Sequence, residues 1–367
     1  RDPEMSRGLG DVYKRQELSY DGYKKVWSDE FNGDSLNRAD WNVETHEKGW
    51  VNNELQEYVD SAENIQVKDG KLIINPVKKV TDGDNGSTKE AVSYTSGRVS
   101  TQNKQTFIYG RFECRAKVPK GQGYLPAFWL MANDENVYGQ WPRCGEIDCM
   151  EVMGQDTNKL YGTIHYGNPH AESQGTYTIK DGEKSFSDDF HTFTCDWEPG
   201  KITWYVDGIK YHEESNWHST TEGQGTLTYP APFDQPFYII LNLAVGGSWV
   251  GNPNEETSFV NNPFVVDYVR VYQKDSYDEN VTRPEVKFEP TNEPDESGNY
   301  IKNSKFAELV PEPTKENYTF AGWYNGDEIF DFTTVPTGDV TLTAKWTAND
   351  YYVSFFLSLI HISEPTR

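Results

Sequence analysis

Residues 111–118 read Arg-Phe-Glu-Cys-Arg-Ala-Lys-Val, and this stretch decides the fold class of the chain. Phe112, Cys114, Ala116 and Val118 occupy every second position, and charged residues stand between them. Because successive side chains of a β-strand point to opposite faces, this period of two predicts a half-buried strand.

Three further segments extend the strand pattern along the chain. Residues 201–206 alternate in the same way and end at Asp207-Gly208, a typical two-residue hairpin turn. Residues 237–245 form a continuous apolar run, as expected of a strand buried on both faces, and residues 264–272 form another strand. Many strands separated by Gly, Asn and Asp turns, with little helical periodicity, predict an all-β fold, a β-jelly-roll sandwich.

Composition divides the chain into unequal units. The strand-rich unit covers residues 17–274, and the polar residues 275–284 resemble a linker. A small β-rich unit follows over residues 285–347. Residues 348–356 contain Tyr-Tyr-Val-Ser-Phe, which echoes the Pro-Glu-Val-Lys-Phe at the start of that unit, and so predict the beginning of a second copy.

The two ends of the chain look foreign to the protein. Residues 357–367, Leu-Ser-Leu-Ile-His-Ile-Ser-Glu-Pro-Thr-Arg, can be encoded by DNA whose complementary strand encodes residues 6–16, Ser-Arg-Gly-Leu-Gly-Asp-Val-Tyr-Lys-Arg-Gln. This relation indicates that both ends were translated from a sequencing adaptor that flanks the cloned DNA. We therefore expect residues 1–16 and 357–367 to be no part of the native fold. We expect the natural protein to extend further in both directions and its signal peptide to lie outside this fragment.

Charge and aromatic content narrow the class of partner. The 34 basic and 58 acidic residues give a net charge of -24, which disfavours nucleic acid and anionic membranes. The 11 Trp and 23 Tyr favour a neutral sugar, whose C–H faces stack on aromatic rings. No apolar run approaches the roughly 20 residues that span a bilayer. The spacing of the cysteines suggests no disulfide framework or zinc site and favours four buried thiols, Cys114, Cys144, Cys149 and Cys195.

Residues 145–151, Gly-Glu-Ile-Asp-Cys-Met-Glu, carry the candidate chemistry. In a regular strand Glu146 and Asp148 would share one face and Glu151 would point to the other. A one-residue β-bulge between Asp148 and Glu151 returns all three acids to one face. The carboxyl groups of the two glutamates would then lie about 5–6 Å apart, which suits double displacement better than inversion.

Three close acids also retain a proton, because like charges cannot all ionise cheaply. A general acid that works near neutral pH needs such a raised pKa. A solvated acidic strand edge and a calcium site are the alternatives, although clustered calcium ligands usually lie on loops rich in Asp, Asn and Gly.

Residues 141–151, Trp-Pro-Arg-Cys-Gly-Glu-Ile-Asp-Cys-Met-Glu, resemble the signature of glycoside hydrolase family 16 in its bulged, laminarinase-like form. The resemblance covers about residues 25–273 and includes Trp27-Ser28-Asp29-Glu30-Phe31, Asn52-Asn53-Glu54-Leu55-Gln56, Ser96-Gly97-Arg98, Tyr109-Gly110-Arg111-Phe112-Glu113, Pro126-Ala127-Phe128-Trp129, Asn242-Leu243-Ala244-Val245-Gly246-Gly247 and Asp267-Tyr268-Val269-Arg270-Val271-Tyr272. It implies a jelly roll with a sugar-binding cleft on its concave sheet. It further implies retaining endo-hydrolysis of β-1,3-glucan (laminarin) or mixed-linkage β-1,3/1,4-glucan, with no required cofactor.

The resemblance also implies roles for single residues. Glu146 is the implied nucleophile, Glu151 the implied acid/base, and Asp148 lies between them and tunes both. Contacts with the sugar are implied for Trp141, Trp129, Asn53, Arg98, His165 and Trp249.

Three of these residues have structural alternatives: Trp129 as a core side chain, Arg98 as an ion-pair partner and His165 as a buried core histidine. Leu125 departs from the pattern, because laminarinase-like members commonly have Trp there. Glu30 and Asp267 match a structural calcium site of some relatives.

Residues 285–347 resemble the Listeria–Bacteroides cell-surface repeat, on Ala321-Gly322-Trp323-Tyr324 and Ala344-Lys345-Trp346. The repeat implies a spacer or adhesin module and a secreted or cell-surface bacterial protein, which we expect to be monomeric.

Three rival functions remain open: another family 16 specificity such as agarase or carrageenase, a transglycosylase, and a non-catalytic glucan-binding lectin. The acidic net charge argues against the first. The presence of both Glu146 and Glu151 argues against the lectin.

Overall fold

The computed structural model describes residues 19–81, 91–217, 219–221, 225–282, 286–289, 314–315, 317–330 and 340–349. The sequence predictions for residues 1–16, 350–356 and 357–367 lie outside these ranges. Every regular element in the described part of the chain is a strand, which confirms the all-β class. The chain divides into two compact units, residues 1–283 and residues 284–367.

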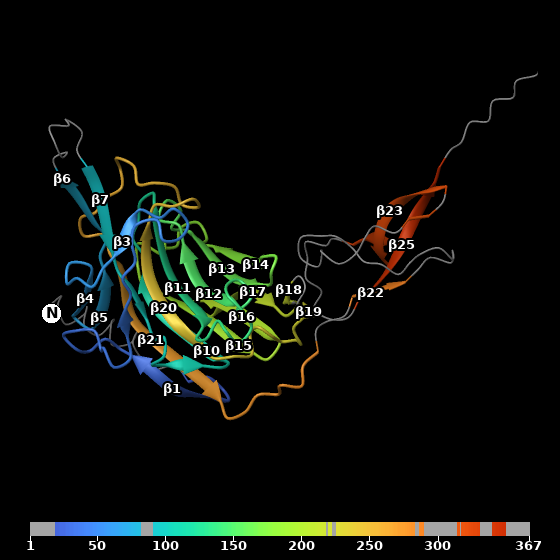
Figure 1. Cartoon of the computed structure of the whole chain (residues 1–367), viewed down its shortest axis with the longest axis horizontal. Coiled ribbons are helices and arrows are strands. Elements are labelled where there is room, and N and C mark those ends of the chain that lie inside the picture. The colour runs from blue at the N-terminus through green and yellow to red at the C-terminus, as the bar shows by residue number, and fades with distance from the viewer. Residues whose placement is uncertain are drawn as a thin grey trace, which may run out of the picture. The chain divides into compact units, whose positions relative to one another are not determined.

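The larger unit is a sandwich of two antiparallel sheets (Figure 1). The first sheet contains, in order across it, β17 (Ile209–Glu214), β16 (Lys201–Val206), β15 (His191–Glu198), β10 (Gly110–Lys117), β21 (Phe264–Lys274), β5 (Lys71–Ile74) and β4 (Ile65–Lys68), with β1 (Tyr23–Asp29) paired to β21.

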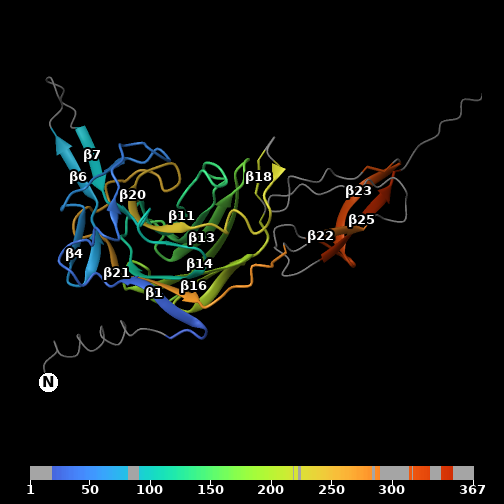
Figure 2. The same cartoon turned by 60° about the horizontal axis from the view of Figure 1, so that its bottom comes forward.

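The second sheet packs on the first, as the turned view in Figure 2 also shows. It contains, in order, β14 (Ala171–Thr178), β13 (Lys159–Tyr166), β12 (Glu146–Val152), β11 (Tyr124–Ala132), β20 (Phe237–Val245), β8 (Arg98–Ser100) and β2 (Asn42–Val43), with β9 (Thr106–Phe107) paired to β20. Two small sheets complete this unit: β3 (Gln56–Tyr58), β7 (Ala91–Ser96) and β6 (Val77–Thr81), and β18 (Thr220–Thr221) with β19 (Gly225–Thr226).

The core lies between the two large sheets and is rich in aromatic rings, among them Trp197, Trp204 and Phe237. Its members include the four alternating residues Phe112, Cys114, Ala116 and Val118, so the predicted inward face of β10 is confirmed. Residues 237–245 are buried throughout, as predicted for β20.

The outer face of β10 is also covered, in contrast to the half-buried strand that the alternation predicts. Glu113 is buried, and the hydroxyl of Tyr268 donates a hydrogen bond to its carboxylate at 2.9 Å. Arg115 is buried beside Phe190, whose ring lies 4.8 Å from the guanidinium. Polar side chains can therefore fill a covered face when each finds a partner.

The four cysteines are buried and unpaired, so the prediction of buried thiols is confirmed. The described residues of the second unit form one sheet, in the order β22 (Val286–Glu289), β25 (Val340–Ala348), β23 (Tyr318–Asn325) and β24 (Glu328–Ile329). Its small core contains Trp323, Leu342 and Ala344, against which Phe320, Phe330 and Trp346 pack.

A pair of glycines lets the hairpin of β13 and β14 lie close to the first sheet. Gly162 and Gly175 are cross-strand partners. A Cβ atom on Gly162 would meet Trp204 Cδ1 at 2.5 Å, and one on Gly175 would meet His212 Cγ at 2.1 Å. Trp204 and His212 stack on each other with ring centroids 4.7 Å apart, so neither ring can move away alone.

We therefore predict that Gly175→Ala lowers the free energy of unfolding by about 1–3 kcal/mol, because it overpacks a filled core. Gly33→Ala is the control, since its added Cβ would find no atom nearer than 3.4 Å. Urea unfolding of both variants measures the effect as a change of midpoint at constant m-value. Equal midpoints for the two variants would contradict this account of the packing.

Candidate functional site

The predicted bulge is present in β12. Asp148 pairs with Thr163 of β13 and Glu151 pairs with Tyr161, so two residues of β12 stand opposite the single residue Gly162. The pairing of β12 with β11 on its other side is shifted at the same place. Both neighbouring strands therefore register the extra residue.

The bulge separates apolar from acidic side chains. Ile147, Cys149 and Met150 are buried members of the core. Glu146, Asp148 and Glu151 are not, and both glutamates are partly exposed. The three acids thus share the face of the second sheet that points away from the core, which we call the site face.

A hydrogen bond from the core and an ion pair on the site face hold the middle of the bulged strand. From the core, Trp204 Nε1 donates to the main-chain carbonyl of Asp148 at 2.9 Å. On the site face, the Asp148 carboxylate is 2% exposed and its Oδ2 lies 3.2 Å from His165 Nε2. His165 is the cross-strand partner of Glu146, which explains why it faces the acids instead of the core.

Two side chains, Trp141 and His165, contact the carboxylate of Glu146. Trp141 Nε1 donates to Glu146 Oε2 at 2.8 Å. His165 Nε2 lies 3.9 Å from the other carboxylate oxygen, Oε1. Both contacts favour the ionised form of Glu146.

The electrostatics of the group are dominated by burial and by like charge. Burial, and then the neighbouring Asp148, raises the pKa of Glu146 to about 8, against the opposing effects of His165 and Trp141. Burial raises the pKa of Glu151 well above its ordinary value, and Asp148 and Glu146 add to this.

Burial alone would lower the pKa of His165, but its contact with Asp148 and the charges of Glu146 and Glu151 outweigh it and raise the pKa to about 10. The site therefore holds at least one carboxyl proton and a cationic imidazole near neutral pH.

A second group of contacts continues from Trp129, the cross-strand neighbour of Asp148. Trp129 is half-buried and its Nε1 donates to Asn242 Oδ1 at 2.7 Å. It is not a core residue, so the core alternative is wrong. The Arg98 guanidinium lies 4.8 Å from the centre of the Trp129 ring.

Arg98 forms an ion pair, as one of the two readings that the sequence leaves open expects. It is 5% exposed and its Nε donates to the carboxylate of Glu44. Its guanidinium also lies over the ring of Trp50, at 5.3 Å. Trp50 is 49% exposed and stacks on His46 with centroids 3.5 Å apart.

Trp50, Glu44 and His46 escaped the sequence analysis. The sequence offers one signal for Trp50, its position three residues before Asn53.

Asn53 and Trp249 lie on neighbouring loops at the other end of the acids. Asn53 Nδ2 donates to Ser248 Oγ at 3.0 Å, next to Trp249 in the chain. Trp249 is 44% exposed and its ring lies 5.1 Å from that of Tyr161, the cross-strand partner of Glu151. The structure thus brings the predicted catalytic and sugar-contacting residues to one side of the second sheet.

Glu30 and Asp267, the residues of the predicted calcium site, each pair with an arginine. Arg270 makes two hydrogen bonds to the Glu30 carboxylate, at 2.8 and 2.9 Å, and Arg115 pairs with the buried Asp267. Calcium is bound by several oxygens that converge on one ion. Each of these carboxylates instead faces its own arginine, so the two residues do not fit the predicted calcium site as arranged here.

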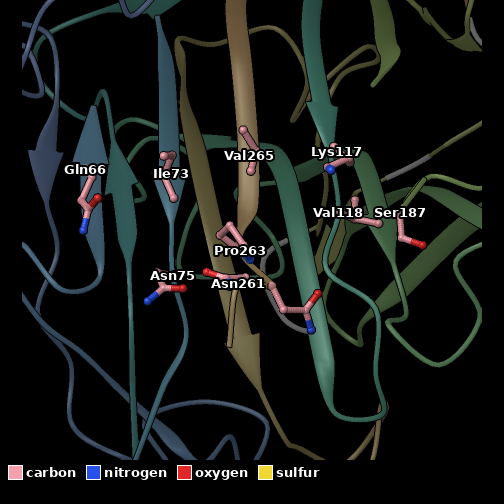
Figure 3. A pocket seen from close by; sticks show the side chains of 10 residues that line it. Gln66, Ile73, Asn75, Lys117, Val118, Ser187, Asn261, Pro263 and Val265 are labelled. Carbon is pink, nitrogen blue, oxygen red and sulfur yellow. The ribbon is translucent and has the colours of Figure 1, made fainter. Parts of the chain in front are cut away.

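A cavity of about 560 Å³ lies on the first sheet, whereas the three acids lie on the second (Figure 3). Figure 3 labels Asn75, Asn261, Lys117 and Ser187 among its lining side chains. Amides, a lysine and a serine offer hydrogen bonds but no pair of acids, so the candidate chemistry stays on the second sheet.

Both units of the chain resemble known protein families. Residues 37–261 match the family Glycosyl hydrolases family 16, and residues 285–345 match the Listeria-Bacteroides repeat domain.

A glucan endo-1,3-beta-glucosidase of Cryptopygus antarcticus is 41% identical over 254 residues, which are 66% of this chain and 90% of that protein. Glucan endo-1,3-beta-glucosidase A1 of Niallia circulans is 39% identical over 266 residues, which are 69% of this chain but only 38% of the relative. The crystal structure of an endo-beta-1,3-glucanase from Pyrococcus furiosus superposes with a TM-score of 0.59 at 39% identity, over 71% of this chain and 98% of that one.

A β-sandwich whose bulged central strand presents three acids beside exposed indole rings is the architecture of a glycoside hydrolase. This chain belongs to glycoside hydrolase family 16, and it continues into a Listeria–Bacteroides repeat. Both resemblances stated from the sequence are confirmed. No helix in the described ranges is long and apolar enough to cross a membrane.

The Arg98–Glu44 pair yields a stability prediction. Arg98→Met keeps much of the side-chain volume but leaves the Glu44 carboxylate without its cation, and breaking such a buried pair costs about 3–5 kcal/mol. The double variant Arg98→Met/Glu44→Gln, which buries no unpaired charge, should recover much of this loss. Urea unfolding of wild type and both variants measures it, and equal stability of the two variants would contradict a structural role for the pair.

The pH dependence has a definite sign. Burial would raise the pKa of Glu44, but Arg98 and the hydrogen bonds outweigh it and lower that pKa. The stabilisation is therefore fully present above the ordinary carboxyl pKa and is lost as pH falls through the lowered value. We expect the difference between wild type and Arg98→Met to shrink in acid.

Proposed function

We propose that this chain is a retaining endo-hydrolase of β-1,3-glucan and mixed-linkage β-1,3/1,4-glucan. Glu146 is the nucleophile and Glu151 the general acid/base. The observation that carries the proposal is the bulge in β12, which sets both glutamates and Asp148 on one face. Two acids that flank a scissile bond at close range suit a covalent glycosyl-enzyme followed by hydrolysis.

The unequal surroundings of the two glutamates support the division of roles. Burial and Asp148 raise the pKa of Glu146 to about 8, and the hydrogen bond from Trp141 and the nearby His165 oppose that rise. These two contacts stabilise the anion of Glu146, the form in which a carboxylate attacks. At Glu151, burial and the negative charge of Asp148 and Glu146 favour the protonated form, as a general acid requires.

Asp148 links the two glutamates. It raises the pKa of both, and its contact with His165 offsets part of its own negative charge. When the glycosyl-enzyme forms, Glu146 loses its charge, so the repulsion that keeps the proton on Glu151 also falls. Glu151 can then act as the base that activates water.

The site face favours a neutral glucan as substrate. Trp50, Trp141 and Trp249 are each about half exposed there and offer flat faces to sugar rings. The net charge of -24 and the three site acids disfavour sulfated galactans. The relatives named above as endo-1,3-beta-glucosidases support the β-1,3 linkage.

The repeat at residues 285–345 supports a secreted, surface-associated enzyme. We propose that it serves as spacer or adhesin, because the site residues named above all belong to the larger unit.

The first prediction from this proposal concerns substrates. Purified protein should release oligosaccharides from laminarin and from barley-type mixed glucan, with negligible release from cellulose. Reducing-end assays with chromatography of the products measure both the rate and the endo pattern. Activity confined to agarose or carrageenan would refute the linkage assignment, and binding to laminarin without any release would favour the lectin. Longer products than the starting oligosaccharide would favour the transglycosylase.

The second prediction separates the carboxylates. Each of Glu146→Ala and Glu151→Ala should lose at least about 10²–10⁴-fold in rate on polysaccharide. On an aryl glycoside with a good leaving group, Glu151→Ala should still form the glycosyl-enzyme, and azide should then release it as the β-glycosyl azide. With Glu146→Ala, azide should attack from the opposite face and yield the α-glycosyl azide.

The control is Glu213→Ala, which removes a glutamate from β17 on the first sheet and should behave like wild type. Identical behaviour of the two site variants, with azide rescuing neither, would overturn the division of roles. Near-wild-type activity of either one would overturn the site itself.

A further inference from the structure

The hairpin of β13 and β14 carries a second cluster of ligand atoms beside the acids. His165 of β13 and Glu172 of β14 are direct cross-strand partners, and His170 lies in the turn between the strands. His165 Nδ1 lies 2.8 Å from His170 Nε2 and 3.5 Å from Glu172 Oε2. His170 and Glu172 are exposed, so the cluster is open to solvent.

These separations match the demands of a small metal ion. The three ligand atoms lie within 4.8 Å of one another. In a tetrahedral zinc site with bonds of about 2.0–2.1 Å, neighbouring ligand atoms are about 3.3 Å apart. Rotation of the exposed His170 and Glu172 side chains by small amounts would bring all three donors to that spacing, while the strand pairing keeps His165 in place.

The contact of the other ring nitrogen of His165, Nε2, is a second and independent indication of a metal site. Histidines that bind a metal usually direct their second nitrogen at a carboxylate or carbonyl, which orients the ring. His165 Nε2 lies 3.2 Å from Asp148 Oδ2, and Asp148 is itself fixed in the bulged strand. Nδ1 is thereby aimed away from the acids and toward His170 and Glu172.

We propose that His165, His170 and Glu172 form a binding site for a divalent transition-metal ion such as Zn²⁺, with a fourth position open to water. Two imidazoles and one carboxylate form a donor set suited to zinc, nickel and copper and poorly suited to calcium or magnesium, which take oxygen ligands. The ion replaces the proton that Nδ1 of His165 now shares with His170, and that proton is released to solvent.

The position of the site makes the metal an inhibitor. The His170 ring lies 5.2 Å from the Trp141 ring, and Trp141 holds Glu146 through its indole nitrogen. An ion with its bound water there occupies space beside the Trp141 ring, where a sugar would stack. It also ties His165 to a cation on the side opposite Asp148. This consequence, unlike metal binding itself, rests on the proposed function.

Calorimetric titration of the full chain, without a polyhistidine tag, with zinc chloride tests the binding. We expect one ion per chain, and at least a tenfold weaker Kd in both His170→Gln and Glu172→Gln. His191→Gln on the first sheet is the matched control and should bind like wild type. Calcium chloride should produce no binding heat.

The two variants also distinguish this site from the other donor set, Glu146, Asp148 and His165, because they leave all three of those ligands intact. Zinc binding of equal strength in wild type, His170→Gln and Glu172→Gln would therefore overturn the proposal. Absence of zinc binding by wild type at millimolar ion would do so as well, as would tight calcium binding that is lost in His170→Gln and Glu172→Gln.

Hydrolysis of laminarin provides the second readout, with each variant compared with its own metal-free rate. Saturating zinc should reduce the wild-type rate at least tenfold, and a chelator should restore it. His170→Gln and Glu172→Gln should keep most of their own rate at the same zinc concentration. Inhibition as strong in the variants as in wild type would overturn the inhibitory role. A chain that binds zinc but hydrolyses no glucan would overturn the proposed function and leave the metal site standing.

Discussion

One extra residue in β12 is the constraint on which the rest of the site depends. Without it, Glu151 would point into a core filled with aromatic rings. The bulge depends on the residues packed around it. The residue opposite it is Gly162, and Trp204 fills the space where a side chain at position 162 would lie. Trp204 in turn donates a hydrogen bond to the carbonyl of Asp148. Core packing and the placement of the acids are therefore one arrangement.

The electrostatics follow from that arrangement. Three carboxyl groups on one short strand cannot all be charged, and burial strengthens their mutual repulsion. The compensating groups come from elsewhere: an indole N–H from the loop before β12 and an imidazole from β13. The indole and the imidazole both contact the part of β12 that contains Glu146 and Asp148. The two glutamates, although chemically identical, therefore have different surroundings and different proton affinities.

Much of this was readable in the sequence, where a strict period of two in β10 predicted the sandwich and a broken period at Glu151 predicted the bulge. Local alternation says nothing, however, about which distant residue covers a strand. The burial of Glu113, the pairing of Arg98 with Glu44 across 54 positions, and the arginine partners of Glu30 and Asp267 all depend on tertiary contacts. The same limit applies to Trp50, which lies beside Arg98 only in the folded chain.

The unpaired cysteines have a practical consequence for this molecule. With no disulfide among Cys114, Cys144, Cys149 and Cys195, packing and hydrogen bonds hold the sandwich together without a covalent cross-link. Sealed thiols react with alkylating reagents only when the structure opens around them. Cys149 lies inside the bulged strand itself. The rate of its alkylation therefore reports how often the segment that bears the acids opens.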